Sequence, residues 1–319
     1  MSTFKELKEE YKASLKSMDT EETIDLMFYR PLGFAWAKLA EKIGVTPNMI
    51  TIASIFLGVG GGILLYFHDN LIWLNYIGIL LIIWANSYDS ADGQLARMTK
   101  QYSRLGRILD GVSGDFWFIA IYIAIVLRVN ETSSFFMSEP WHPWLIWALA
   151  ALAGLCHAKQ AAMADYYRQF HLYFLKGEEG SELDSSVQLQ KEYDQMSWKN
   201  DFFKKFTATF YLNYTKNQER WTPKMQTLRA ELKSRMGDKI SQQFRDDFRK
   251  KSRPLMKYTN MLSFNTRIIA MFISVIIQMP WLYFVFELVV LNIMLGYMVL
   301  SHEHRCNTLT KDLRNGKYE

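Results

Sequence analysis

Long apolar runs alternate with strongly charged stretches along the 319 residues of the chain. Six of these runs have about the length that an α-helix needs to cross a bilayer, roughly 20 residues. They lie at 47–67, 71–88, 106–129, 143–163, 258–279 and 281–301. The second and third are apolar at one end and polar at the other. The pattern therefore predicts an all-α integral membrane protein with six transmembrane helices.

The segment before the first apolar run also has a helical pattern. Residues 26–43 interleave aromatic and basic side chains, which is typical of an amphipathic helix lying in the membrane interface. The first span then begins at Thr46-Pro47-Asn48, where Thr46 can cap the helix and Pro47 suits its first position.

A charged segment separates the fourth apolar run from the fifth. Residues 176–257 carry 18 basic and 12 acidic residues with scattered aromatic ones. We expect a helical insertion on the cytoplasmic face, either simply solvated, or acting over the active site, or holding anionic lipid. The chain then divides into the N-terminus with the interfacial helix (1–46), spans one to four (47–175), the insertion (176–257), and the last two spans with the tail (258–319).

The basic residues set the orientation. Seven Lys or Arg precede the first span, three lie between the second and third, and four follow the last, whereas the links 68–70 and 130–142 contain none. The positive-inside rule then places both termini in the cytoplasm, and we expect a bacterial inner membrane. The net charge of +5 is small. The 25 N-terminal residues are too polar for a signal peptide. The two cysteines are too few for a disulfide framework or a cysteine metal site.

Three carboxylates gather where the second and third spans turn polar. Asp89 and Asp92 are three residues apart and share a helix face, and Asp110 starts the neighbouring antiparallel helix. Charges at a membrane boundary are costly and are usually retained for function. Three carboxylates without His or Cys favour Mg²⁺ or Mn²⁺ over zinc.

The residues around these carboxylates suit a diphosphate. Small side chains leave room for a ligand, and the planar fork of Arg97 suits phosphate oxygens. We assign the contacts with this diphosphate-containing ligand to Gly93, Ala96, Arg97, Ser103 and Gly106.

This arrangement resembles the signature of the CDP-alcohol phosphatidyltransferase family. The signature has Asp, two residues, Asp-Gly, two residues, Ala-Arg, eight residues, Gly, three residues, Asp, three residues and Asp. Its first seven fixed positions are matched here by Asp89, Asp92, Gly93, Ala96, Arg97, Gly106 and Asp110. The stretch Thr46-Pro47-Asn48-x-Ile50-Thr51 is also similar to the family. The resemblance implies two metal ions, a CDP-linked donor, usually CDP-diacylglycerol, and an alcohol acceptor.

The chain departs from the signature at its last position. The fourth Asp would fall at Gly114, but Asp115 follows instead. The resemblance gives this Asp to metal binding and to the general base, alongside Asp110. In a regular helix, a shift of one position turns a side chain by about 100° around the axis. We expect a local bulge near Gly111 and Gly114 to return Asp115 to the site. The alternative is a base from elsewhere.

Polar residues in the later spans suggest where an acceptor binds. The fourth span carries His157, Gln160 and Arg168, and the fifth carries Arg267. Such stripes can also serve hydrogen bonding between helices, and a single His is often a core residue. An isolated Arg in a span needs an anionic partner, here Glu287, a donor phosphate or an acceptor phosphate. We expect an anionic polyol acceptor such as inositol, inositol phosphate or glycerol phosphate.

Several functional alternatives stay open on the sequence. Transfer of a CDP-linked head group to a lipid hydroxyl would use the same carboxylates. A cation transporter is disfavoured because the sequence has no inverted repeat and its carboxylates lie at the membrane edge. A non-catalytic scaffold built on the insertion would explain the departure at Gly114. We expect an enzyme that binds membrane lipid, forms a homodimer and has no nucleic-acid partner.

Overall fold

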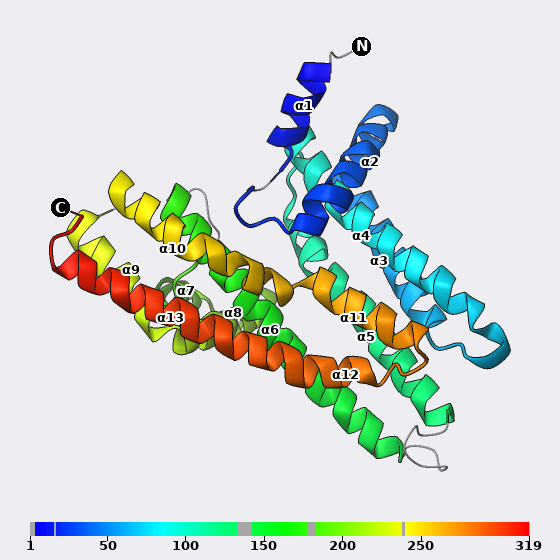
Figure 1. Ribbon diagram of the computed structural model, residues 1–319. Helices are drawn as coiled ribbons and strands as arrows, with labels where there is room; N and C mark the ends of the chain where they lie inside the picture. Colours follow the sequence, from blue (N-terminus) through cyan, green and yellow to red (C-terminus); the bar gives the residue numbers. More distant parts are fainter. Residues whose placement is uncertain (1–3, 16, 133–141, 178–182, 238–239, 319) are drawn as a thin grey trace. The chain divides into compact units, whose positions relative to one another are not determined.

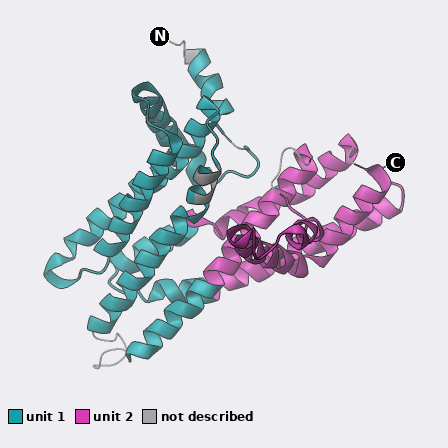
Figure 2. Cartoon of the chain, turned by 180° about the vertical axis from the view of Figure 1, so that it is seen from behind, with its two compact units in different colours: residues 1–155, 265–288 teal, residues 156–264, 289–319 magenta. Residues whose placement is uncertain are grey.

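The structure, a computed structural model, describes residues 4–15, 17–132, 142–177, 183–237 and 240–318. All regular elements in these ranges are helical, which confirms the all-α prediction. The chain forms two compact units (Figure 2). The first contains Met1–Leu155 and Asn265–Leu288, and the second contains Cys156–Phe264 and Val289–Glu319.

The helices of the first unit come mainly from the N-terminal half of the chain (Figure 1). They are α1 (Phe4–Ala13), η1 (Asp25–Tyr29), α2 (Arg30–Ile43), α3 (Pro47–Leu64), η2 (Asp69–Leu71), α4 (Trp73–Thr99), α5 (Arg104–Glu131), the start of α6 (Pro143–Lys176), α11 (Phe264–Ile276) and α12 (Leu282–Phe286). Of these, α3 packs extensively on both α4 and α5.

Glycines allow α3 to approach its two neighbours closely. A Cβ atom on Gly61 would lie 2.7 Å from the backbone oxygen of Gly78 in α4, so a side chain has no space there. On another face of α3, Gly58 makes room for the indole ring of Trp117 in α5. Small residues at helix contacts are the usual means of close packing within a membrane. This packing holds the polar ends of α4 and α5 against the same helix.

The predicted interfacial helix is α2, which packs on α4. Its buried Ala37 and Ala40 join Ala91 and Leu95 of α4 in one apolar cluster. The helix ends at Gly44, whose φ of 75° lies in the left-handed region that favours glycine. The helix therefore covers the polar half of α4, beside the three carboxylates.

The second unit holds the charged insertion and the C-terminal helix (Figure 2). Its helices are the rest of α6, then α7 (Ser186–Gln195), α8 (Phe202–Trp221), α9 (Pro223–Met236), α10 (Gln242–Met261) and α13 (Asn292–Arg314). The insertion is helical, as predicted. Helix α9 is separate from α10 because it stops at Gly237, whose φ is 60°.

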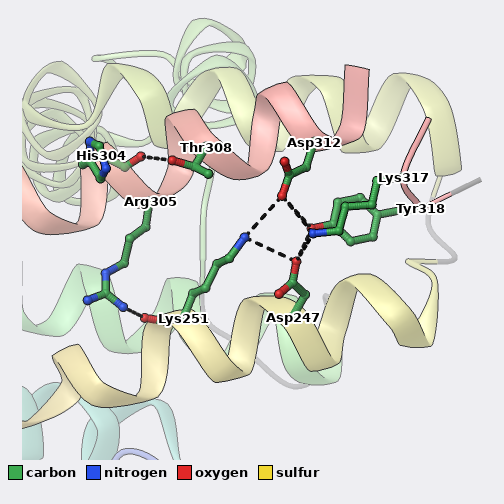
Figure 3. Close-up of polar contacts among 8 residues, drawn as sticks. All are labelled: Asp247, Lys251, His304, Arg305, Thr308, Asp312, Lys317 and Tyr318. Atoms are coloured by element: carbon green, nitrogen blue, oxygen red, sulfur yellow. Dashed lines mark hydrogen bonds and ion pairs between the residues drawn. The ribbon is translucent and has the colours of Figure 1, made fainter. Parts of the chain in front are cut away.

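A polar cluster fastens the C-terminus to α10 (Figure 3). Lys317 Nζ lies 3.0 Å from Asp247 Oδ2 and 3.0 Å from Asp312 Oδ2, and Lys251 Nζ lies 3.3 Å from the same two atoms. The hydrogen bonds to Asp247 and Asp312 raise the pKa of Lys317 above its ordinary value. Tyr318 also donates to Asp247 and packs edge-on against Phe244, with ring centroids 5.2 Å apart.

Five segments of the described chain are long and apolar enough to cross a membrane: Pro47–Leu64, Leu109–Glu131, Pro143–Lys176, Gln242–Ile276 and Leu282–Arg314. The predicted second span lies in α4 and is not among them, because Asn75 and Asn86 bound a short apolar stretch. The count of six spans therefore stays a prediction. The predicted fifth span is divided between α10 and α11, and the sixth contains a π-helical turn at Glu287–Leu291. Most of the predicted link 130–142 lies outside the described residues.

Candidate active site

The three predicted metal-binding carboxylates of Asp89, Asp92 and Asp110 come together in the first unit. One oxygen from each lies within 4.8 Å of the others. Asp89 and Asp92 share a face of α4 because they are three residues apart, and Asp110 stands in the second turn of α5. Burial differs along the cluster: Asp92 is 3% exposed, Asp89 is partly buried and Asp110 is exposed.

Hydroxyl groups hold two of these carboxylates in place. Thr51 Oγ1, on α3, donates a 2.5 Å hydrogen bond to Asp92 Oδ2. Ser113 Oγ, one turn beyond Asp110 on α5, lies 2.9 Å from Asp89 Oδ1. Each contact joins neighbouring helices at the carboxylate cluster. The sequence pattern alone indicates no role for either residue, although Thr51 belongs to the stretch that is similar to the family.

The donor set of this cluster fits a hard divalent cation. All of its charged groups are oxygen donors, the preferred ligands of Mg²⁺ and Mn²⁺. Three anionic groups this close repel one another, and a partly buried site weakens the screening by water. The hydroxyls of Thr51 and Ser113 orient the carboxylates without neutralising them. A divalent cation would supply the missing positive charge.

Arg97 is fixed from the N-terminal segment. Its Nε donates a 2.5 Å hydrogen bond to the backbone oxygen of Ser14, and Ser14 Oγ accepts a 3.0 Å hydrogen bond from Gln94 Nε2. The guanidinium lies over Gly93, where an added Cβ would approach Arg97 Nη1 to 3.4 Å. Gly93 therefore gives space to Arg97 itself, while Ala96 is partly buried on the same helix.

Ser103 and Gly106 build the start of α5. Ser103 Oγ accepts a 2.8 Å hydrogen bond from the Gly106 backbone N–H, which caps the helix. Ser103 Oγ also lies 3.1 Å from Asn48 Oδ1 at the start of α3. A Cβ on Gly106 would collide with this Asn48 oxygen and lie 2.9 Å from Ser103 Oγ, so both side chains would have to shift to admit it. Both residues position the third carboxylate in this structure, and their donor contact stays a prediction.

Asp115 lies outside the carboxylate cluster. The expected local bulge is wrong, because α5 continues as a regular α-helix through residues 110–115. Asp115 is exposed and is not in the three-carboxylate group. Gly114 follows Asp110 by one helical turn, and an added Cβ there meets nothing within 4 Å. An acidic side chain would therefore have space at position 114.

Arg30 is a residue of the site region that the sequence motif does not include. Its Nη1 donates a 3.2 Å hydrogen bond to Ser90 Oγ, directly after Asp89. Its Nε forms a 2.9 Å ion pair with Glu21 Oε2. Its guanidinium, like that of Arg97, belongs to the same unit as the carboxylates. The sequence feature that could point to it is its position as the single Arg in residues 26–43, the predicted interfacial helix.

Arg267 is paired inside the first unit. Its Nη1 lies 2.5 Å from Glu287 Oε1, and the two side chains are 1% and 0% exposed. Tyr283 donates a 2.8 Å hydrogen bond to the same carboxylate oxygen, and Tyr122 donates to Glu287 Oε2. Glu287 is one of the three partners that the sequence allows for Arg267. Its pairing and burial favour a structural role for Arg267 over the predicted acceptor anchor.

The other predicted acceptor residues lie on the part of α6 that belongs to the second unit. Gln160 Nε2 donates a 2.9 Å hydrogen bond to Asn292 Oδ1, and Arg168 Nε donates a 3.2 Å hydrogen bond to Asn260 Oδ1. These bonds fit the alternative of hydrogen bonding between helices. The acceptor role of His157, Gln160 and Arg168 stays a prediction.

The helices and the carboxylates together define a class of protein. It is an integral membrane protein that places a candidate divalent-cation site at the polar ends of two packed helices.

Comparison with known proteins gives a family match for part of the chain. Residues 44–168 match the family model described as CDP-alcohol phosphatidyltransferase. This range contains the three carboxylates and α3, α4 and α5. These residues are therefore similar to the CDP-alcohol phosphatidyltransferase family, in agreement with the signature.

A curated relative matches a shorter stretch. It is the CDP-diacylglycerol–glycerol-3-phosphate 3-phosphatidyltransferase of Cereibacter sphaeroides, 33% identical over 82 residues. The match spans 25% of this chain and 35% of the relative, so about a third of that relative is covered. No solved structure matches the chain.

Proposed function

We propose that this protein is a CDP-alcohol phosphatidyltransferase of phospholipid biosynthesis. It transfers a phosphatidyl group from CDP-diacylglycerol to a small polar alcohol and releases CMP. One observation carries the proposal: the carboxylates of Asp89, Asp92 and Asp110 meet within 4.8 Å inside the segment that matches the family.

The reaction is a direct displacement at phosphorus. The acceptor oxygen forms a bond to the phosphatidyl phosphorus, the bond from this phosphorus to the CMP oxygen breaks, and the hydroxyl proton passes to a carboxylate. Asp110 is our first choice as proton acceptor, because it is the exposed member of the cluster. Asp115, the alternative base, is five residues further along α5 and also exposed.

The remaining residues bind and orient. Asp89, Asp92 and Asp110 would hold Mg²⁺ or Mn²⁺, and we propose two ions. The bound cations would neutralise the diphosphate and stabilise the leaving CMP. Arg97, fixed by the Ser14 carbonyl, adds positive charge beside Gly93 for the donor diphosphate. Thr51 and Ser113 keep two carboxylates from rotating away.

The acceptor is proposed as an anionic polyol. The relative from Cereibacter sphaeroides is named for glycerol 3-phosphate, which supports glycerol phosphate among the three candidates. Arg30 donates a hydrogen bond to Ser90, the residue after Asp89. Its guanidinium would therefore suit an acceptor phosphate. We also propose that the site opens to the cytoplasm, that the membrane is a bacterial inner membrane and that the enzyme works as a homodimer.

The test is release of CMP by purified protein reconstituted in lipid. CDP-diacylglycerol is supplied with Mg²⁺ or Mn²⁺ and with glycerol 3-phosphate, inositol or inositol phosphate in separate reactions. We expect CMP to appear together with a new phospholipid for one of these acceptors. Excess chelator should stop the reaction, and zinc should not restore it because soft ligands are absent from the cluster.

The same assay separates the rival functions. CMP formed only from CDP-choline or CDP-ethanolamine with diacylglycerol would replace the proposal by transfer of a head group to a lipid. Full turnover in excess chelator would exclude the metal-dependent reaction. If no CDP-linked donor releases CMP while a binding assay shows metal uptake, a transporter or scaffold becomes the better explanation.

A further inference from the structure

Helix α8, in the charged insertion, carries a row of aromatic side chains on one face. Phe203, Phe206, Phe210, Tyr214 and Trp221 recur at spacings of three, four or seven residues, so they share one side of the helix. All five are exposed, Phe203 at 81% and Phe210 at 61%. Large aromatic groups gathered in this way are unusual on a surface that meets water.

An adjoining face of α8 packs on protein. Leu212, Thr215 and Gln218 are buried, and none of them lies in the aromatic row. The backbone also continues into α9 through Thr222, which is fully buried. The aromatic row therefore lies beside this packed face, and at its C-terminal end Trp221 contacts Lys159 of α6.

The C-terminal end of α8 is attached to a membrane helix. Gln218 Nε2 donates a 2.8 Å hydrogen bond to the backbone oxygen of Ala162 in α6. Lys159, also in α6, donates a 2.9 Å hydrogen bond to Asn217 Oδ1 and lies 4.3 Å from the centre of the Trp221 ring. All of these residues belong to the second unit.

These contacts place the C-terminal end of α8 beside the end of the apolar part of α6. The apolar part of α6 runs from Pro143 to about Met163, within a segment long enough to span the bilayer. Lys159 and Ala162 lie in its last turn, so α8 joins α6 where the hydrocarbon region ends. Trp and Tyr are enriched at that depth, and a lysine stem can reach from it to the headgroups.

Charge around the aromatic row matches a lipid surface. Residues 198–221 contain five basic residues and two acidic ones. Lys199, Lys204 and Arg220 are exposed. A helix with an aromatic face and basic flanks is typical of a membrane-surface segment that prefers anionic lipid. A second copy of the same face would bring like charges together, which disfavours a dimer contact.

We propose that α8 is an interfacial helix: its aromatic row lies in the headgroup and upper acyl region of the bilayer, and its basic residues bind anionic lipid phosphates. The insertion is thereby attached to the membrane at a point separate from the spans. This inference rests on α6 and α8 alone and holds whether or not the protein transfers a phosphatidyl group.

Spin labelling of the full-length protein tests the depth of α8. Cys156→Ser and Cys306→Ser remove the native thiols, and single cysteines then replace Phe206, Phe210 or, as a control on another face, Lys216. The labelled proteins are placed in phosphatidylcholine bilayers with or without phosphatidylglycerol. Collision with oxygen, which enters lipid, is compared with collision with a water-soluble nickel chelate.

We expect labels at 206 and 210 to favour oxygen and the label at 216 to favour the nickel chelate. Added phosphatidylglycerol should move the labels at 206 and 210 deeper, and Lys199→Glu with Lys204→Glu should cancel that shift. Equal nickel access at all three positions would overturn the interfacial position. Low access to both reagents with spin–spin broadening would mean a protein contact and would also refute it. An unchanged depth after phosphatidylglycerol is added would refute the anionic-lipid preference.

Discussion

Thr51 on α3 donates a hydrogen bond to Asp92 on α4, the most deeply buried carboxylate of the candidate metal site. The 2.5 Å contact joins residues 41 positions apart in sequence. It fixes the carboxylate in one orientation before any cation arrives. Outer-shell partners of this kind affect metal affinity because they hold the ligand in place.

Thr51→Val should therefore weaken metal activation. The substitution keeps the side-chain shape and removes the hydroxyl donor, so we expect the metal concentration for half-maximal CMP release to rise by about 10- to 100-fold. Thr51→Ser keeps the hydroxyl and should stay close to wild type. Equal behaviour of the two variants in a Mg²⁺ titration would show that the hydrogen bond has no part in metal binding.

Replacement of the clustered carboxylates should abolish transfer without unfolding the protein. Asp89→Asn, Asp92→Asn and Asp110→Asn keep the volume of each side chain and remove one unit of negative charge. CMP release should disappear in each, while the thermal midpoint in detergent is kept. Asp69→Asn, at an exposed turn with a φ of 52°, is the matched control. Wild-type turnover in any of the three would contradict the metal assignment.

Position 114 distinguishes the two possible bases. Gly114→Asp restores the family signature at a site with open space, and we expect tighter metal activation because 114 follows Asp110 by one helical turn. Asp115→Asn should lower turnover far less than Asp110→Asn, since Asp115 is outside the cluster. Complete loss of activity in Asp115→Asn, with folding intact, would instead make Asp115 the base.

The buried pair of Arg267 and Glu287 should respond to single and double substitution differently. Arg267→Met alone leaves a buried carboxylate without its cation and should cost about 3–5 kcal/mol of stability. The double variant Arg267→Met/Glu287→Met should recover most of that loss. Acceptor KM should be unchanged in the double variant. A strongly raised acceptor KM there, with a stable fold, would return Arg267 to the role of phosphate anchor.

The C-terminal cluster should depend more on Tyr318 than on Lys317. Tyr318 is 3% exposed and packs on Phe244, so Tyr318→Ala should cost about 3–5 kcal/mol, as for other buried aromatic residues. The Lys317 side chain is 46% exposed, and Lys317→Ala should have a much smaller effect. Thermal unfolding in detergent compares the two, and a larger loss for Lys317→Ala would reverse the assignment.

The sequence predicts the helices and the three carboxylates because both depend on local spacing. Asp89 and Asp92 share a helix face by their separation alone, and the apolar runs mark the spans. It does not predict Thr51 or Ser113, because their role depends on which helices pack together. Nor does it predict the course of α5 at Asp115. The two glycines nearby permit a bulge, but the backbone hydrogen bonds of a regular helix are retained in the structure.

Because Arg97 is hydrogen-bonded to the Ser14 carbonyl, the candidate active site includes a residue outside the segment that matches the family. The matched segment starts at residue 44, whereas the group that holds Arg97 comes from residue 14. A shortened protein that begins at residue 44 would keep every signature residue and lose that anchor, together with Arg30 and all of α2. Sequence changes upstream of the matched segment can therefore alter the candidate active site while leaving the signature intact.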